Sequence, residues 1–381
     1  MEDENKAKRP NNETSSKKKA MARRVKTPKM SMEGKQRRKK RGRWEEEKIL
    51  GGICEKSLIG QLYLKPLDFA FRRELGSSSL SMTASDFEFH HELGSGSFGK
   101  VMLASWTRTK QLVAMKVMEK GAVLTTSILK ERRTLEIARG CPFLCEGLAA
   151  FQTQKHVFLT MEYIRGGSLQ SYMDEKSCLE TYEANDLKPD NILLDGGGHV
   201  KLADFGLVAE NMLKGQKTSD KTGTRYYMAP EVLADGEYDA AVDWWALGII
   251  ICEMLTGDHP YDTFLSSEEF RHIVIMRKPD YPDWVTTETK GIVSKLLMKN
   301  PKYRLGVYGN IRLHPFYGDL CWEDLEHRKI PPPYEPLVQT TQDPKSHSQE
   351  RSLSFLEAWK SFSGYGHTIF GLSFTSSRLR D

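Results

Sequence analysis

Apolar positions divide the chain into a polar N-terminal tail, a β-rich part and an α-rich part. Residues 1–43 carry almost no aliphatic side chains, which predicts a disordered tail, and residues 44–86 are interpreted as a linker. From residue 87 the apolar pattern predicts strands first and helices later. The predicted strands are Phe87–Leu93, Lys100–Trp106, Gln111–Met118 and His156–Ile164, and the predicted helices are Thr125–Ala138 and Ala241–Leu255.

The order of these elements predicts an α+β fold with two lobes, because helices dominate after Asp204. The stretch Ala241–Leu255 is apolar on all sides and is therefore predicted to be a buried helix. Its apolar run is too short to span a bilayer and contains Glu253. The N-terminus has no apolar core typical of a secretion signal, and the six cysteines are scattered. We therefore expect an intracellular protein, in the cytoplasm or the nucleus.

Charge is distributed unevenly over the 381 residues, whose formal net charge is +5. Residues 1–43 hold 17 Lys and Arg against 5 Asp and Glu, whereas the rest holds 39 against 46. A mildly acidic body excludes a basic domain that coats nucleic acid. For the basic residues 17–43, binding to an import receptor, to anionic lipid or to nucleic acid stays open beside a solvated tail without function.

A glycine-rich turn lies between the first two predicted strands. Residues 94–101 fit the pattern G-x-G-x-x-G-x-V, in which glycines let the backbone approach phosphate groups closely. A dinucleotide-binding fold needs a helix directly after these glycines, whereas a strand is predicted here. The turn therefore indicates a phosphate-binding loop of another kind.

Two charged residues break the apolar pattern of their elements and are predicted to pair. Lys116 interrupts the apolar run Leu112–Val117, and Glu131 lies on the apolar face of its helix, three residues after Ile128. Because a buried charge needs a partner, each supports the burial of the other.

Three further motifs follow in a fixed order. Asp186-Leu187-Lys188-Pro189-Asp190-Asn191 precedes Asp204-Phe205-Gly206, which begins thirteen residues after Asn191, and Ala229-Pro230-Glu231 follows. Carboxylate and amide oxygens are hard ligands suited to Mg²⁺.

With these motifs in this order, residues 87–316 resemble the eukaryotic protein kinases. Residues 243–248, 300–306, 314–316 and 330–336 are similar to the basophilic group that includes protein kinases A, B and C. Residues 161–167 and the tail 330–336 are most similar to the novel protein kinase C branch of that group. The zinc modules of that branch are expected to be absent. The resemblance implies a small antiparallel β lobe with one key helix, a larger helical lobe, and a C-terminal kinase tail at 317–381.

The resemblance also implies the site residues. ATP would be bound by Leu93, Gly94, Ser95, Gly96, Ser97, Phe98, Gly99, Val101, Ala114, Lys116, Glu131, Met161, Glu162 and Ile164. Asn191 and Asp204 would coordinate Mg²⁺. Asp186 would accept or orient the substrate hydroxyl proton, Lys188 would steady the γ-phosphate, and Thr224 would brace Asp186. Asp243, and Glu231 paired with Arg304, would have structural roles.

The chain departs from the family before its catalytic loop. The segment between Gly167 and Asp186 is about 20 residues short, a loss of ~30 Å of helix. Ala184-Asn185 replace His/Tyr-Arg, Asp220 stands at the usual phosphorylation position, and Ser168 replaces an acidic residue. In place of the missing helix, Met173–Ala184 would give only thin apolar cover. Asp190 and Glu253 keep some acidic character near the expected substrate groove.

Two C-terminal segments resemble phosphorylation motifs of these kinases. Ile369–Phe374 is similar to the hydrophobic motif that docks on the small lobe, with a frayed tail as the alternative, and Arg351–Phe355 is similar to the turn motif.

The main hypothesis is a serine/threonine protein kinase that uses Mg-ATP, favours basic sequences and is a monomer. The alternatives are a pseudokinase or scaffold of the same fold, a poorly folding splice form or faulty gene product, and, more remotely, a nucleic-acid binder.

Overall fold

The computed structural model describes residues 82–96, 99–175, 187–207, 217–219, 223–333 and 368–379. The predictions for the basic tail 1–43, for most of the linker 44–86 and for the turn motif 351–355 lie outside these residues. At the end of the predicted linker, Ala84–Asp86 form the short 3₁₀ helix η2.

A six-stranded antiparallel sheet forms the small lobe, with the strand order β1-β2-β3-β5-β4-β8. Its strands are β1 (Phe87–Gly96), β2 (Gly99–Trp106), β3 (Leu112–Glu119), β4 (Gly147–Gln152), β5 (His156–Glu162) and β8 (Phe374–Thr375). The four predicted strands are confirmed to within a few residues. β4 was not predicted, because its sequence Gly-Leu-Ala-Ala-Phe-Gln contains no β-branched residue.

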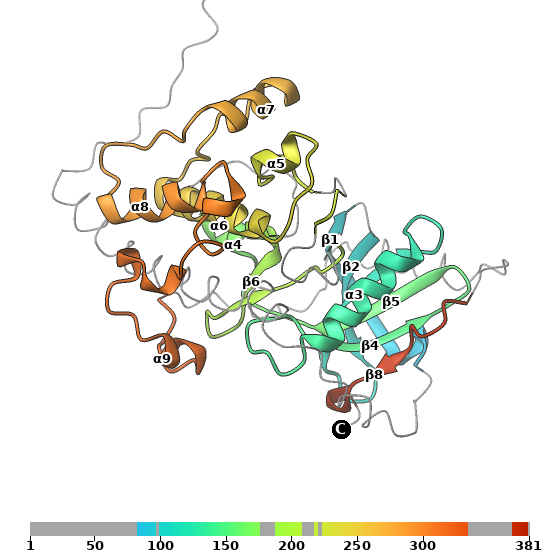
Figure 1. Cartoon of the computed structure of the whole chain (residues 1–381). Helices are drawn as coiled ribbons and strands as arrows, with labels where there is room; N and C mark the ends of the chain where they lie inside the picture. The colour runs from blue at the N-terminus through green and yellow to red at the C-terminus, as the bar shows by residue number, and fades with distance from the viewer. Residues whose placement is uncertain are drawn as a thin grey trace, which may run out of the picture. The chain divides into compact units, whose positions relative to one another are not determined.

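Helix α3 (Thr125–Ile137) lies across one face of the sheet, as Figure 1 shows. Ile128 and Leu135 are seven residues apart on one side of this helix, and both are buried in the main core together with Met118 and Leu159 of the sheet. The predicted helix at this position is confirmed. Its packing fixes Glu131, on the same face, over the sheet.

The helical lobe is built around α6 (Ala241–Thr256), the helix predicted to be buried. At Gly248 a Cβ atom would lie 2.8 Å from Leu296 Cβ, so the glycine permits the close packing of α6 against α8. The other elements are α4 (Leu169–Glu175), η3 (Pro189–Asn191), β6 (Ile192–Leu194), β7 (Val200–Leu202), α5 (Pro230–Leu233), α7 (Ser267–Met276), α8 (Thr287–Leu296), η4 (Pro301–Tyr303), η5 (Ile311–Leu313), η6 (Pro315–Tyr317) and α9 (Trp322–Glu326). Among the described residues, no helix is both long and apolar enough to cross a bilayer.

A buried ion pair ties this lobe together. The Arg304 guanidinium donates to both carboxylate oxygens of Glu231, at 2.8 Å and 2.9 Å, and Arg304 is fully buried. The predicted pairing of these two residues is confirmed. Asp243 lies in the first turn of α6, where burial raises its pKa to about 7.

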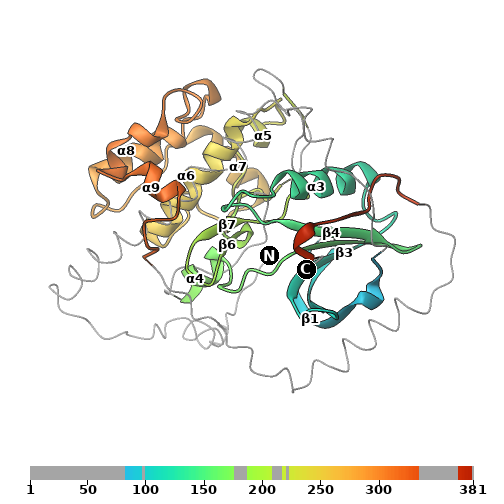
Figure 2. The ribbon, with the colours of Figure 1, turned by 90° about the horizontal axis from the view of Figure 1, so that it is seen from below.

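The C-terminal segment docks on the small lobe, as its resemblance to a hydrophobic motif predicted. Strand β8 pairs with β4, and η7 (Ser377–Leu379) follows it at the C-terminal end (Figure 2). Ile369, Leu372 and Phe374 are buried, whereas Ser373 is exposed. The alternative of a frayed tail is therefore wrong for residues 368–379.

The segment Met173–Ala184, considered as apolar cover in place of the missing helix, is described only at its start. Met173 belongs to α4, which ends at Glu175, and residues 176–186 lie outside the described part of the chain. The predicted loss of the long helix thus stays a prediction.

Candidate active site

Three charged side chains from separate elements meet at the centre of the candidate site. Lys116 Nζ, on β3, donates to Glu131 Oε1 of α3 at 2.7 Å and to Asp204 Oδ1, just after β7, at 2.9 Å. Lys116 and Glu131 are both buried, at 5% and 2% exposed. The predicted Lys116–Glu131 pair is confirmed, and Asp204 joins it.

The charges of this cluster support one another. Burial alone would lower the pKa of Lys116, but Glu131 and Asp204 outweigh it and raise that pKa above its usual value. Burial likewise favours the neutral form of Asp204, yet the Lys116 ammonium leaves the pKa of Asp204 lowered. At neutral pH the cluster therefore holds a cationic Lys116 and an ionised Asp204.

The backbone around Asp204 presents its carboxylate to the outside. Asp204 has φ +55°, a conformation that residues other than glycine rarely adopt. Its neighbour Phe205 is buried, whereas the Asp204 side chain is 45% exposed. At Gly206 a Cβ atom would lie 3.3 Å from Lys116 Nζ and 3.3 Å from Asp204 Oδ1. A side chain at position 206 would therefore make tight contacts with two members of this cluster.

Asn191 is held next to Asp204 by the backbone. The amide of Ala203 donates to the carbonyl of Asn191 at 2.8 Å, which places residue 191 beside the residue before Asp204. An amide oxygen and a half-exposed carboxylate fit Mg²⁺, which binds through few protein ligands and keeps water and phosphate oxygens for the rest. Lys188 Nζ lies 3.7 Å from Asp190 Oδ2, and its charge also lowers the pKa of Asp204.

The glycine-rich turn joins β1 to β2 as predicted. Gly99 has φ +131°, and a Cβ atom there would lie 2.2 Å from the Val117 carbonyl oxygen, so packing requires this glycine. At Gly94 and Gly96 a Cβ atom would meet nothing within 4 Å. Packing does not require those two glycines, which fits a role in letting a ligand approach the backbone. Leu93 and Ser95 are exposed and Val101 is half-buried.

The end of β5 and the residues just beyond it carry three of the residues predicted to bind ATP. Met161 is buried and pairs with Ala114 of β3, and Ile164 is buried two residues beyond Glu162. Glu162 Oε1 accepts hydrogen bonds from Lys201 Nζ at 2.5 Å and from the Glu146 amide at 2.9 Å. Sequence reasoning missed Lys201 and Glu146, because neither lies in a motif and β4 itself was not predicted.

The structure leaves three of the predicted site residues undescribed. Asp186, Ser97 and Phe98 lie outside the described residues, as do Ala184, Asn185 and Asp220. Thr224 is buried, but its predicted partner Asp186 is not described.

The described residues of the helical lobe line at least two hollows. One, of about 440 Å³, is lined by Tyr227, Glu253, Asp258 and Asp262 among others. Tyr227 donates to Glu253 Oε2 at 3.0 Å, and burial raises the pKa of Glu253 to about 8.

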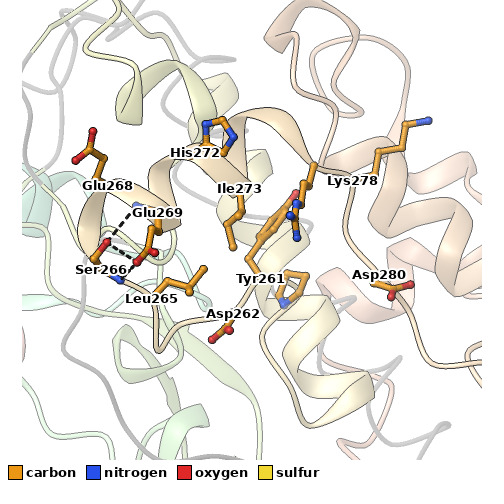
Figure 3. A pocket seen from close by; sticks show the side chains of 12 residues that line it. Tyr261, Asp262, Leu265, Ser266, Glu268, Glu269, His272, Ile273, Lys278 and Asp280 are labelled. Carbon is orange, nitrogen blue, oxygen red and sulfur yellow. Dashed lines mark hydrogen bonds between the residues drawn. The ribbon is translucent and has the colours of Figure 1, made fainter.

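The other hollow, of about 930 Å³, lies along α7 (Figure 3). At its rim, Ser266 caps α7 by accepting from the Glu269 amide at 3.3 Å and by donating to Glu269 Oε2 at 2.6 Å. The residues that line it include none of those predicted to bind ATP or Mg²⁺.

The fold and the cluster define a two-lobed α+β catalytic domain. The profile of the protein kinase domain matches residues 87–185 and 184–317. The chain therefore belongs to the protein kinase family. The two matches meet at residues 184–185, where the sequence predicts a shortened segment.

The chain is also similar to several protein kinases C. It is 38% identical to protein kinase C delta type of Rattus norvegicus over 289 residues, which cover 68% of this chain and 43% of that protein. It is 38% identical to protein kinase C of Drosophila melanogaster over 284 residues, covering 67% of this chain and 38% of that protein. Protein kinase C eta type of Mus musculus is 35% identical over 277 residues, covering 65% and 40%. The chain thus spans about two fifths of the length of these relatives.

Proposed function

We propose that the chain is a serine/threonine protein kinase that transfers the γ-phosphate of ATP to protein hydroxyl groups with Mg²⁺. The observation that carries this proposal is the cluster of Lys116, Glu131 and Asp204, because kinase catalysis needs the Lys–Glu pair and the metal-binding aspartate in place together. Membership of the protein kinase family and similarity to protein kinases C support it.

In this proposal each lobe has its own task. Lys116, oriented by Glu131, holds the α- and β-phosphates, while the backbone of Gly94, Gly96 and Gly99 covers them. The backbone of Glu162 and Ile164 binds adenine.

Asp204 and Asn191 hold Mg²⁺, which neutralises charge on the transferred phosphate when bound. Lys188 steadies the γ-phosphate, and Asp186, braced by Thr224, orients the substrate hydroxyl. Catalysis then rests on positioning and on fixed charge.

The smaller hollow supports a preference for basic substrates. Glu253, Asp258 and Asp262 contribute three carboxyl groups to it. A guanidinium group that enters the hollow stabilises the ionised form of Glu253 and gains a charged hydrogen bond. Serine or threonine peptides with nearby arginines are therefore the proposed substrates.

A pseudokinase is the second candidate, favoured by the break in the family match at 184–185 and by Asn185 in place of the usual arginine. Such a protein would bind ATP through Lys116 and Asp204 without efficient transfer. Binding and transfer must therefore be measured separately.

The deciding experiment measures γ-phosphate transfer from Mg-ATP to an arginine-rich serine peptide. The parent chain is compared with Asp186→Asn and with Asp319→Asn, a matched change at an exposed aspartate of the helical lobe. Transfer by the parent and by Asp319→Asn, but not by Asp186→Asn, supports the kinase. An ATP-induced melting shift without transfer supports the pseudokinase. Neither shift nor transfer, from protein that melts cooperatively, contradicts both.

We further propose that the basic residues 17–43 act apart from catalysis and direct the protein to the nucleus or to anionic surfaces. Deletion of residues 1–43 should then change the location in cells and leave transfer intact. Loss of transfer would contradict a separate tail. A monomer is the proposed oligomeric state.

A further inference from the structure

The C-terminal segment contacts the small lobe beyond the docking of its apolar side chains. Arg378 NH1 lies 2.7 Å from Glu146 Oε2, immediately before β4. The Arg378 side chain is 64% exposed, whereas that of Glu146 is 9% exposed. Within the described part of the chain, Arg378 is the cation paired with this buried carboxylate. A buried carboxylate that loses its partner is destabilised, so the position of Glu146 depends on the last residues of the chain.

Glu146 is joined in turn to the predicted adenine-binding segment. Its carbonyl accepts from the Glu162 amide at 3.0 Å, and its own amide donates to Glu162 Oε1 at 2.9 Å. The adjacent Cys145 Sγ lies 3.9 Å from the Glu162 carbonyl oxygen. Residues 145 and 146 therefore contact both the backbone and the side chain of Glu162.

The C-terminal segment is anchored on both sides of Arg378. On one side Phe374 is buried in the main core, and on the other Leu379 is buried in a second cluster with Leu148 and Phe151. Between them the Ser376 amide donates to the Leu148 carbonyl at 2.7 Å. Anchors before and after Arg378 reduce the entropy lost when its side chain pairs with Glu146.

Two ion pairs lie along this path, and their two carboxylates are its inner members. Arg378 pairs with Glu146, and Lys201 pairs with Glu162, whose carboxylate also accepts the Glu146 amide. Without Arg378, the Glu146 carboxylate would lose its paired cation, while Lys201 would stay paired with Glu162. Electrostatic repulsion and the need to hydrate Glu146 would then pull residue 146 away from Glu162.

We propose that Arg378 is a positioning residue for nucleotide binding, because its ion pair with Glu146 holds the start of β4 against Glu162. The role at adenine rests on the proposed function, whereas the coupling of Arg378 to Glu162 does not. The C-terminal end of the chain thereby sets the affinity for ATP without touching the nucleotide.

The test uses the full chain with Arg378→Met, which removes the charge and keeps an unbranched apolar side chain. The dissociation constant for ATP should rise about fivefold, equivalent to about 1 kcal/mol, while kcat changes less than about twofold. Hydrogen exchange of the Glu162 amide should become faster, because its acceptor at Glu146 is no longer held. Arg378→Lys should restore both values to within about twofold of the parent.

Two further variants separate positioning from general stability. Lys329→Met removes a cation of similar exposure, 61%, from its pair with Asp324, and should change neither ATP affinity nor exchange at Glu162. In a Glu146→Gln background, Arg378→Met should have no further effect, because the carboxylate it pairs with is already neutral.

Faster exchange in Arg378→Met with rescue by lysine supports the proposal. Unchanged exchange at Glu162 in Arg378→Met overturns it, and so does a loss that appears equally in Lys329→Met. If the parent itself binds no ATP, the proposed kinase function fails, while exchange at Glu162 still decides whether Arg378 positions this segment.

Discussion

Neutralising Glu131 in its buried ion pair with Lys116 should lower the free energy of unfolding, and the contacts of the two residues set the size of the loss. In Glu131→Gln the side chain keeps its shape, and Lys116 keeps Asp204 at 2.9 Å. Loss of one partner of a buried ion pair costs ~3–5 kcal/mol. We expect the lower end, ~3 kcal/mol, because Asp204 still compensates Lys116. In a domain of this size that lowers Tm by ~6–12 °C.

Lys116→Met should be more destabilising, because it leaves the buried Glu131 without its cation. The double variant Lys116→Met/Glu131→Gln removes both charges and should therefore be more stable than Lys116→Met alone. The assay is thermal unfolding followed by circular dichroism at pH 7.5. Glu88→Gln, a matched change in the exposed pair with Lys110, should shift Tm by less than about 2 °C.

The pH dependence gives a second check on the same pair. Since the pKa of Lys116 is raised above its ordinary value of 10.5, its contribution is complete below that pH and is lost only as pH rises through the folded value. The difference in Tm between the parent and Glu131→Gln should thus be constant from pH 7 to pH 9. A Tm of Glu131→Gln within about 2 °C of the parent would contradict a buried ion pair of this strength, and so would a double variant that is the least stable of the three.

Three other predictions follow from single contacts. Asp204→Asn should abolish phosphate transfer, and titration calorimetry should show that Mg²⁺ no longer tightens ATP binding, because the proposed metal ligand has lost its charge; unchanged transfer would contradict the proposed site. Since the pKa of Glu253 is about 8, its carboxyl group ionises as pH rises from 7 to 9, so KM for an arginine-rich peptide should fall over that range, and Glu253→Gln should abolish the trend. Arg304→Met should cost ~3–5 kcal/mol in urea unfolding, because it leaves the Glu231 carboxylate buried without its guanidinium; a loss below about 1 kcal/mol would show that the pair matters little.

Motifs and periodicity were sufficient to predict most elements of the small lobe. The run Leu112–Val117 and the spacing of Ile128 and Leu135 carried enough apolar pattern to define β3 and α3. β4 carried too little, because a strand without β-branched residues is stabilised by its neighbours β5 and β8 rather than by its own propensity. The docking of Ile369 and Leu372 likewise depends on contacts with residues far away in the sequence. The sequence alone therefore left a docked segment and a frayed tail as alternatives.

The candidate site divides in the same way. Lys116 and Glu131 could be paired from sequence, since two charges in apolar surroundings require each other. The same reasoning could not find Glu146 and Lys201, because neither residue breaks an apolar pattern or lies in a motif. They contact the site only because the fold brings both to the carboxylate of Glu162 at the end of β5.

By itself the sequence determined the family, the order of most elements and the groups that we propose to bind phosphate and metal, because these depend on residue types at fixed spacings. Only the tertiary structure decided that Asp204 completes the Lys116 cluster and that Arg378 reaches Glu146 across 232 positions of the chain. Such pairings depend on how strands and helices pack, and spacing along the chain does not encode them. An ion pair between distant residues forms only after the hydrophobic core has fixed both backbones, so its partners carry no local signal.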